Sequence, residues 1–354
     1  MPLRLLVVDD SALYRKILSE AASSLPGVET ATAPNGAIAL SRLAADHYDL
    51  VLLDIFMPEK NGPEVLADIR REHPGVAVVM VSGATGRDAE ITLGTLSSGA
   101  MDFIAKPAAG SMEAGITDLK ADISRVLQLL AAKTAKTAPQ PVPPAQSAPP
   151  AAGASRPSVP PHLDILLIGV STGGPKALGE ILPLLPQNFP VPVVIVQHMP
   201  PVFTRSLAEQ LDRRCALKVL EAPAGHIPKA GEILIAPGGC HLELFRDPSG
   251  ALATRFSDAP PVHSCRPSVD VLFESAARCG LRGAVAIILT GMGSDGAEGV
   301  RALKNALPVW CIAQNAETCT VYGMPQAVVQ AGLDDECLPL EKIGPRLNQL
   351  FRAA

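Results

Sequence analysis

The chain has 354 residues, with 30 lysines and arginines against 35 aspartates and glutamates, and a formal net charge of −5. This length predicts two domains, each large enough to bury a core. The acidic balance argues against a nucleic-acid-binding protein and supplies no polybasic membrane signal. No apolar run is long enough to span a bilayer and no signal peptide is evident, so we expect a cytoplasmic protein without membrane insertion. The seven cysteines form no CxxC pair, and we expect reduced, largely buried thiols.

The first 130 residues or so alternate between apolar segments of strand length and segments with helical periodicity. This alternation predicts a flavodoxin-like, doubly wound parallel sheet of five strands with helices on both faces. Ligands of such sheets bind at the carboxyl ends of the strands. The last helix should end near Ala132. The predicted strands are 3–8, 28–33, 49–54, 76–82 and 102–106.

Polar residues stand at the carboxyl ends of four of these strands, namely Asp9 and Asp10, Asp54, Ser82, and Lys106. Carboxylates that converge on one edge repel each other unless a cation lies between them. Mg²⁺ suits such a site because it keeps open positions for phosphate oxygens. Asp54 can then accept a phosphoryl group, with Ser82 and Lys106 holding its other oxygens. A lone acidic residue here is more often a helix N-cap, but this set of five makes that alternative weak.

The same region resembles response-regulator receiver domains. The matching motifs are VVDD (7–10), LLDIFMPEKNG (52–62), VSGAT (81–85) and GAMDFIAKP (99–107).

The resemblance implies that a histidine kinase phosphorylates Asp54 in the presence of Mg²⁺. The site residues that it implies are Asp9, Asp10, Asp54 and the Phe56 carbonyl for the metal, and Ser82, Phe103 and Lys106 for the switch.

Residues 133–162 consist almost entirely of Ala, Pro, Ser, Gln and Thr, without apolar periodicity. Such a segment cannot bury enough surface to offset its ordering entropy, and its prolines favour extended conformations. We therefore expect a receiver domain at 1–132, a linker at 133–162 and a second domain at 163–354. A PxxP ligand within the linker is the weaker alternative.

The second domain opens with an apolar run from Ile165 to Ile168 that breaks at Gly169. Ser171 then enters a glycine turn ahead of a segment with helical spacing. A strand that ends in such a turn holds a hydroxyl clear of the sheet, with free backbone N–H groups beside it. This geometry suits a nucleophile, although a serine that merely caps the helix fits these residues equally well.

Two other strand ends of this domain carry His198, after the apolar run 192–196, and Asp295, after the apolar run that starts at residue 284. Parallel strands linked by helices lie close together, so these side chains can meet Ser171 at one sheet edge. A histidine can take the serine proton while a carboxylate fixes its tautomer, which predicts acyl transfer to water. The turn Gly291–Gly293 offers N–H groups for an oxyanion.

The remaining elements of this domain are predicted less sharply. Residues 231–245 suggest a hairpin or bent strand pair with Gly238 and Gly239 at its turn, and 266–280 suggest an amphipathic helix. A final strand at 309–315 and a helix at 319–332 complete the α/β pattern.

Several alternatives remain for the members of this triad. GVSTG also fits the nucleophile elbow of α/β-hydrolases, but no histidine follows Asp295 as the residue order of that fold requires. Asp295 could also simply cap the next helix. Competing bases are His226, His241 and His263, and competing acids are Asp258 and Asp270.

The whole chain resembles the chemotaxis CheB family, protein-glutamate methylesterases with an N-terminal receiver. The motifs that carry this resemblance are GVSTGGPKAL (169–178), VIVQHMPPVFT (194–204), ILIAPGGCHLEL (233–244), RPSVDVLFESAA (266–277), ILTGMGSDGAEG (288–299) and VYGMP (321–325).

The CheB resemblance implies a Rossmann-like α/β catalytic domain without a cofactor, with a mainly parallel sheet. It implies hydrolysis of glutamate methyl esters on chemoreceptors, with release of methanol, and deamidation of glutamines. Ser171, His198 and Asp295 fall on the nucleophile, base and orienting acid, with Thr172 and Met292 beside the reacting centre. The receiver should cover the active site until phosphorylation, and the protein could be recruited to chemoreceptor arrays.

Departures from the family pattern occur at 305–308, which lacks the usual glycine, and at Asn315, where an acid is common. These affect the expected strength of autoinhibition and the receptor preference rather than the triad. A response regulator with a DNA-binding or catalytically silent output is the alternative class. A DNA-binding output is usually small, basic and helical, unlike this domain.

Overall fold

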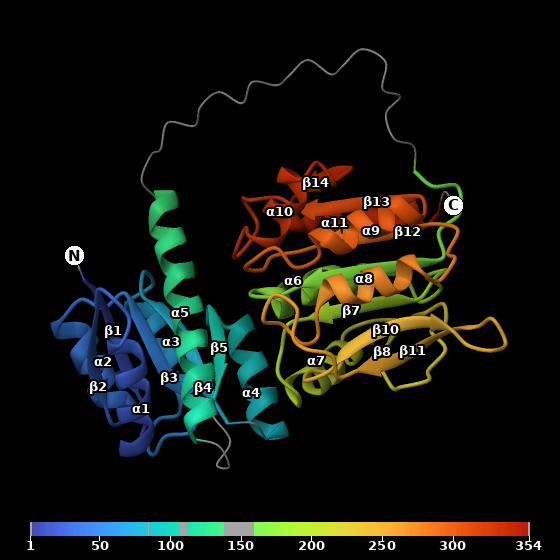
Figure 1. Cartoon of the computed structure of the whole chain (residues 1–354). Coiled ribbons are helices and arrows are strands. Elements are labelled where there is room, and N and C mark those ends of the chain that lie inside the picture. Colours follow the sequence, from blue (N-terminus) through green and yellow to red (C-terminus); the bar gives the residue numbers. More distant parts are fainter. Residues whose placement is uncertain (1, 84, 107–111, 138–158, 353–354) are drawn as a thin grey trace.

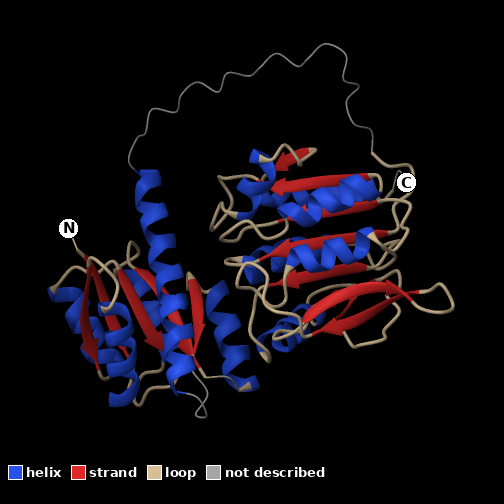
Figure 2. Ribbon diagram, viewed as in Figure 1, coloured by secondary structure: helices blue, strands red, loops and turns tan. Residues whose placement is uncertain are grey.

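The computed structural model describes residues 2–83, 85–106, 112–137 and 159–352. They form two α/β bodies that lie side by side, with β5 (Asp102–Ala105) and α4 (Gly86–Ser97) of the first body nearest the second (Figures 1 and 2). Each body is built on its own parallel sheet.

The first body is a five-stranded parallel sheet in the order β2-β1-β3-β4-β5. This confirms the predicted flavodoxin-like receiver fold. Its elements are β1 (Leu3–Val8), α1 (Ala12–Ser23), β2 (Val28–Ala33), α2 (Gly36–Ala45), β3 (Leu50–Asp54), α3 (Gly62–Glu72), β4 (Ala77–Ser82), α4 (Gly86–Ser97), β5 (Asp102–Ala105) and α5 (Met112–Thr137).

Both faces of this sheet are buried. Along β1, Leu6 and Val8 belong to one hydrophobic core, whereas Leu5 and Val7 belong to another. Successive side chains of a strand point to opposite faces, so the two cores lie on opposite sides of the sheet. This double burial explains why the strands read as continuous apolar runs.

Helix α5 continues to Thr137 and thus runs past the end predicted near Ala132. Residues 133–137 of the predicted linker are therefore helical, as the alanine and the two lysines among them favour. Most of the predicted linker, residues 138–158, lies outside the described residues. The domain boundaries at 132 and 163 stay a prediction.

The second body is a seven-stranded sheet in the order β14-β13-β12-β6-β7-β9-β8, with every described strand pair parallel. This confirms the predicted α/β domain with a mainly parallel sheet. Its elements are β6 (Ile165–Val170), α6 (Gly174–Ile181), η1 (Leu182–Leu184), β7 (Val193–Gln197), α7 (Phe203–Asp212), β8 (Lys218–Glu221), β9 (Glu232–Ile235), β10 (His241–Arg246), β11 (Leu252–Ser257), α8 (Val269–Ala277), β12 (Ala284–Ile288), α9 (Ala297–Ala306), β13 (Val309–Gln314), α10 (Met324–Gln330), β14 (Glu336–Leu338) and α11 (Leu340–Leu350).

The hairpin predicted at 231–245 is wrong. Strand β9 belongs to the main sheet, and β10 pairs instead with β11 in an antiparallel ribbon. Gly238 and Gly239 do form a turn, but it leads from the main sheet into the ribbon. Gly238 packs so closely against the Pro200 and Pro201 backbone that a Cβ there would lie 2.4 Å from it. The hairpin turn of the ribbon is at 247–250, where the Asp247 carboxylate accepts backbone N–H groups and Gly250 has a positive φ.

Candidate active site

Three neighbouring strands at the centre of the second sheet position Ser171, His198 and Asp295. Ser171 directly follows β6, His198 directly follows β7, and Asp295 lies in the turn between β12 and α9. The sheet order places β6 between β12 and β7. The next strand in the chain, β7, lies on one side of β6, whereas the later strand β12 lies on the other side. The three residues therefore lie at the switch point of the strand order, where ligands of open α/β sheets bind.

The His198 imidazole is bound to the Asp295 carboxylate. Nε2 of His198 lies 2.7 Å from Oδ2 of Asp295, and the carboxylate is 2 % exposed. Oδ2 also accepts the Val269 N–H, and Oδ1 accepts the Ser268 hydroxyl and the Asp270 N–H. Burial alone would raise the pKa of Asp295, but His198 and these donors at the start of α8 lower it. The carboxylate is thus a fixed anion.

The other ring nitrogen of His198 is the one that can exchange a proton at the site. Nδ1 lies 3.5 Å from Sγ of Cys265, a residue that the sequence analysis did not single out. Burial lowers the pKa of His198, but the hydrogen bonds to Asp295 and Cys265 outweigh it and raise the pKa to about 9. The contact with Asp295 thus stabilises the imidazolium that forms when the ring accepts a proton.

Ser171 is 8 % exposed and borders the same cavity of about 680 Å³ as His198 and Cys265. Its backbone is fixed, since its N–H donates to the Thr290 carbonyl and its carbonyl accepts the Gln197 side chain. Within the described ranges, no hydrogen bond links its hydroxyl to His198. The structure thus brings the two groups to one cavity without joining them.

The predicted oxyanion turn differs in one respect from the expectation. The Gly291 N–H donates to the Val321 carbonyl and is not free to stabilise an oxyanion. Gly291 forms an isolated parallel β-bridge with Tyr322, and its N–H is one of the backbone groups paired in this bridge. Met292 and Gly293 border the cavity, so any contribution of this turn must come from their N–H groups.

The first body closes one side of this cavity. Nη1 of Arg125, on α5, lies 2.6 Å from the Asp102 carboxylate at the start of β5 and donates to the Thr172 hydroxyl at 2.9 Å. That hydroxyl in turn donates to Asp102 at 3.1 Å. Thr172, the residue after Ser171, is therefore held by two side chains of the receiver fold.

Two further contacts join the bodies. The Phe103 ring on β5 stacks on Phe203 at the start of α7, with 4.4 Å between the ring centroids. At the surface, Arg213 lies 3.0 Å from Glu90 of α4. The predicted switch aromatic thus lies at the interface between the bodies.

The predicted phosphoacceptor site lies at the carboxyl edge of the first sheet. Carboxylate oxygens of Asp9, Asp10 and Asp54 all lie within 4.8 Å of one another. Nζ of Lys106 lies 2.8 Å from Asp9 and 2.7 Å from Asp54. Burial raises the pKa of Asp54 to about 6 and Asp9 adds to this, although Lys106 opposes it. Hard oxygen donors grouped in this way fit a cation such as Mg²⁺.

The other predicted receiver residues lie around this cluster. Ser82 ends β4, and its hydroxyl accepts a hydrogen bond from Thr92 at 2.7 Å and donates to the Gly83 carbonyl. Phe56 follows β3 by two residues, beyond Asp54, which ends that strand. Its ring is exposed, with the Arg87 guanidinium 5.9 Å from the ring centroid.

Comparison with known proteins agrees with this architecture. Family models for the response regulator receiver domain and the CheB methylesterase match residues 5–114 and 166–347. The protein-glutamate methylesterase/protein-glutamine glutaminase of Geobacillus kaustophilus is 44 % identical over 352 residues, which is 99 % of each chain. This chain belongs to the CheB methylesterase family.

Two other relatives extend the comparison. A CheB-family protein of the same name from Salmonella typhi is 40 % identical, covering 98 % of this chain and 96 % of that protein. The crystal structure of the Thermotoga maritima CheB methylesterase catalytic domain is 43 % identical with a TM-score of 0.51, covering 53 % of this chain and 99 % of that one. Among the described residues of this CheB-family chain, no helix has the length and apolar character to cross a membrane.

The competing histidines occupy other surroundings in this CheB fold. His226 pairs with Glu232 at 2.9 Å, and the His241 ring lies between the Pro260 carbonyl and the Ser268 N–H. Neither borders the cavity that Ser171 shares with His198. The competing acid Asp258 contacts Arg266 through its backbone carbonyl.

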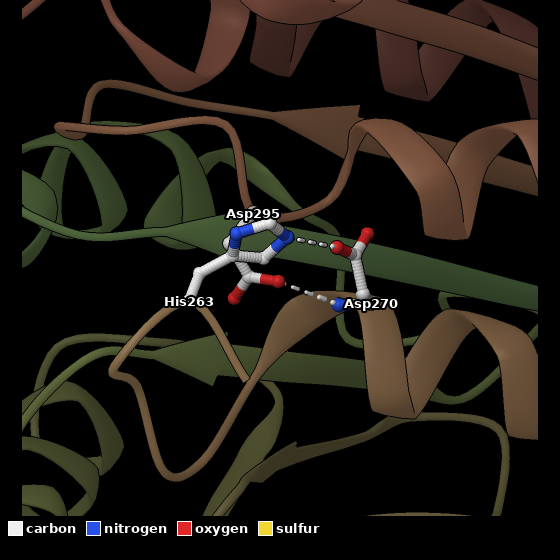
Figure 3. A group of neighbouring side chains, drawn as sticks. All are labelled: His263, Asp270 and Asp295. Atoms are coloured by element: carbon white, nitrogen blue, oxygen red, sulfur yellow. Dashed lines mark hydrogen bonds and ion pairs between the residues drawn. The ribbon is translucent and has the colours of Figure 1, made fainter. Parts of the chain in front are cut away.

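His263 and Asp270, the remaining competitors, form a group with Asp295 (Figure 3). Nε2 of His263 lies 3.2 Å from Oδ2 of Asp270. One ligand atom from each of the three residues lies within 4.8 Å of the others. A carboxylate has about four acceptor positions, and Asp295 already receives four hydrogen bonds. Asp295 therefore has no acceptor position left for a metal ion, so these three residues do not fit a metal site.

Proposed function

We propose that this chain is a phosphorylation-activated hydrolase that demethylates glutamate methyl esters on the cytoplasmic domains of chemoreceptors, releases methanol, and also deamidates glutamines. The observation that carries this proposal is the 2.7 Å contact between His198 and Asp295 in the cavity that Ser171 borders. The names of the relatives supply the substrate class. Adaptation in a chemotaxis pathway is the role that follows.

The reaction begins with attack of the Ser171 hydroxyl on the ester carbonyl carbon. The hydroxyl proton passes to Nδ1 of His198, because Nε2 is already bound to Asp295. The same proton then goes to the leaving methoxide, which departs as methanol and leaves an acyl-serine. Water, deprotonated by His198, cleaves this ester and regenerates the serine. With a glutamine side chain the leaving group is ammonia.

The negative oxygen of each tetrahedral intermediate needs donors that are already in place. Met292 and Gly293 border the cavity and supply backbone N–H groups, while the Gly291 N–H is engaged elsewhere. Thr172 can add its hydroxyl only when Asp102 and Arg125 release it. The contact that the receiver makes with Thr172 therefore opposes catalysis directly.

Phosphorylation of Asp54 by a histidine kinase should relieve this block. Mg²⁺ would be held by Asp9, Asp10 and Asp54, with the Phe56 carbonyl as a further ligand, and when bound it would neutralise charge on the transferring phosphoryl group. Lys106 is positioned to hold a phosphoryl oxygen because it already contacts Asp54.

The signal has a short route to the second domain along β5. This strand begins at Asp102, carries Phe103 and runs directly into Lys106. A change at Lys106 can therefore reach both the Thr172 contact and the ring stack on Phe203. We expect the protein to act in the cytoplasm, where it could be recruited to chemoreceptor arrays.

The decisive experiment is methanol release from methylated chemoreceptors by the full chain, with and without a small acyl-phosphate donor. Ser171→Ala should lower the release by at least about 10³-fold, because it removes the nucleophile. Phosphorylation of Asp54 should be unchanged. The matched control is Ser249→Ala, in the exposed turn between β10 and β11, which should keep full activity. Undiminished release by Ser171→Ala would refute the proposal.

A further inference from the structure

The carboxylate of Asp270 is buried in the first turn of α8 and is not used in the mechanism above. Its Oδ1 accepts the N–H of Gly296 at 2.9 Å and the N–H of Gly299 at 2.6 Å. These N–H groups belong to the start of α9 and have no partner within that helix. Asp270 therefore binds one helix to the beginning of another.

Asp295 makes the reverse connection. It immediately precedes Gly296, and its own carboxylate accepts the N–H groups of Val269 and Asp270 at the start of α8. Each acid thus holds the helix that begins at the other, as the contact between Asp295 and the Asp270 backbone in Figure 3 shows. Displacement of the Gly296 peptide would carry Asp295 away from His198.

The packing at this junction leaves little freedom. A Cβ at Gly299 would lie 2.7 Å from Cβ of Phe273 and 3.1 Å from Oδ1 of Asp270. Glycine is therefore needed for the close approach of α9 to α8. The short distance between the Asp270 carboxylate and the α9 backbone is thus a built feature of the two helices.

The second oxygen of Asp270 holds the wall of the cavity. Oδ2 lies 3.2 Å from Nε2 of His263, whose side chain is 44 % exposed and borders the cavity. His263 and Ser264 both have positive φ, and Cys265 follows them against Nδ1 of His198. Asp270 is thereby connected to both sides of the His198 ring, to Nε2 through Asp295 and to Nδ1 through the loop of His263.

We propose that Asp270 is a positioning residue for the hydrolysis, which fixes Asp295 through the Gly296 and Gly299 N–H groups and fixes the cavity wall through His263. This inference rests on the proposed function. Loss of the α9 contacts of Asp270 should mainly lower kcat, because these contacts position Asp295 and through it the base His198. Loss of His263 should mainly raise KM, because its loop borders the cavity.

The charges around Asp270 make a second readout available. The groups that face it are Asp295 ahead of α9 and His263 from its loop, with His198 beyond Asp295. Burial raises the pKa of Asp270, and the neighbouring Asp295 raises it further. An ionised Asp270 favours the imidazolium form of His198, so its removal should lower the pH at which His198 becomes a base.

The test is the pH profile of methanol release by the phosphorylated full chain. Asp270→Ala should lower kcat about a hundredfold, as expected when a catalytic group is misplaced by an ångström. Asp270→Asn keeps an oxygen acceptor for both glycine N–H groups and should restore kcat to within a few-fold of the wild type. Both variants should move the acidic limb of the profile to lower pH.

Two further variants complete the experiment. His263→Ala should raise KM several-fold with little change in kcat. Glu298→Ala removes an exposed acid from the first turn of α9 and should change neither kcat nor the pH profile. Circular dichroism checks that each variant is folded. If Asp270→Ala does not fold, the pH profile of Asp270→Asn and the KM of His263→Ala still test the inference.

Wild-type kcat in a folded Asp270→Ala, equal losses in folded Ala and Asn variants, or an unmoved acidic limb in Asp270→Asn would each overturn the inference. A wild-type KM in His263→Ala would overturn the part assigned to the loop. Failure of the proposed function itself would look different, since wild-type protein would then release no methanol. The two failures are therefore distinguishable in one series of assays.

Discussion

Asp54 and Asp295 occupy equivalent places in the two domains, but their surroundings shift their pKa values in opposite directions. Asp54 ends β3 and Asp295 follows β12, and both strands lie inside a parallel sheet. Both carboxylates are buried, and each lies 2.7 Å from the nitrogen of a basic side chain, Lys106 or His198. Yet the pKa of Asp54 is raised to about 6, whereas that of Asp295 is lowered. Strand-end position alone therefore does not determine how a carboxylate behaves.

The difference comes from the number of donors around each carboxylate. Asp295 receives two backbone N–H groups and a hydroxyl at the start of α8, in addition to His198. Asp54 receives the N–H of Ile55 and shares Lys106 with Asp9, whose charge opposes its ionisation. The Asp295 carboxylate has all its acceptor positions filled and can orient His198. The Asp54 carboxylate accepts fewer hydrogen bonds and keeps acceptor positions for a metal ion and a phosphoryl group.

The largest effect should follow from replacing the saturated carboxylate. Asp295→Asn introduces an amide whose N–H₂ must face donors, and it removes the acceptor that fixes the His198 tautomer. Methanol release should fall by about 10⁴-fold while phosphorylation of Asp54 continues. Steady-state assays with a phosphodonor measure this. A loss of tenfold or less in a folded variant would mean that Asp295 does not orient the base.

The equivalent replacement in the receiver should have a different consequence. Asp54→Asn removes the phosphoacceptor, so a phosphodonor should no longer stimulate methanol release, whereas basal release persists. Removing Mg²⁺ with a chelator should likewise abolish stimulation of the wild type, without affecting basal activity. The ratio of rates with and without donor is the measured quantity. Full stimulation of Asp54→Asn would contradict the regulatory part of the proposal.

Stability should report the two raised pKa values over separate pH ranges. The folded pKa of His198 is about 9 against an ordinary 6.5, so its stabilisation is complete below 6.5 and is lost as pH rises to about 9. The folded pKa of Asp54 is about 6 against 3.8, so its contribution is complete below 3.8 and is lost as pH rises to about 6. Over each range the free energy of unfolding should fall by about 3 kcal/mol.

Urea unfolding across these ranges measures the free energy of unfolding. His198→Gln should flatten the decline in the upper range, and Asp54→Asn should flatten the decline in the lower range. If both variants flattened the same range, the assignment of the two shifts would be wrong.

The sequence predicted most of the elements because their periodicity is strong. The receiver sheet was predicted strand by strand, and Ser171 and His198 were placed because each directly follows a buried strand. The elements that escaped prediction include β14, which has only three residues, and α11, which contains Pro345. A three-residue strand gives no measurable alternation, and a proline normally argues against a helix.

The side-chain partners could not be predicted from the sequence. Cys265 reaches His198 through an irregular loop with two positive φ residues, which no periodic pattern encodes. The sequence indicates Asp270 only as a competing acid, and its contacts with α9 depend on how two helices pack. The Gly291 N–H was expected to be free, but a bridge to a segment thirty residues away engages it. All three depend on tertiary packing.

The smallest predicted effect concerns the interface between the two carboxylate sites. Arg125→Gln removes one charged hydrogen bond across the interface, the one to Thr172, worth about 1.5–3 kcal/mol, together with the ion pair to Asp102 inside the receiver. Release of the receiver should raise the activity of unphosphorylated protein about tenfold, with no change in the fully phosphorylated rate. The comparison is made by methanol release without donor.

The matched control at the same interface is Arg213→Gln, which breaks the exposed pair with Glu90. Exposed pairs contribute about 0–1 kcal/mol, so basal activity should rise only a few-fold at most. Equal increases in both variants would mean that any loosening of the interface activates, without a special role for Thr172. A selective increase in Arg125→Gln would instead link the two sites through β5, since that strand begins at the acid facing Thr172 and leads into the lysine facing Asp54.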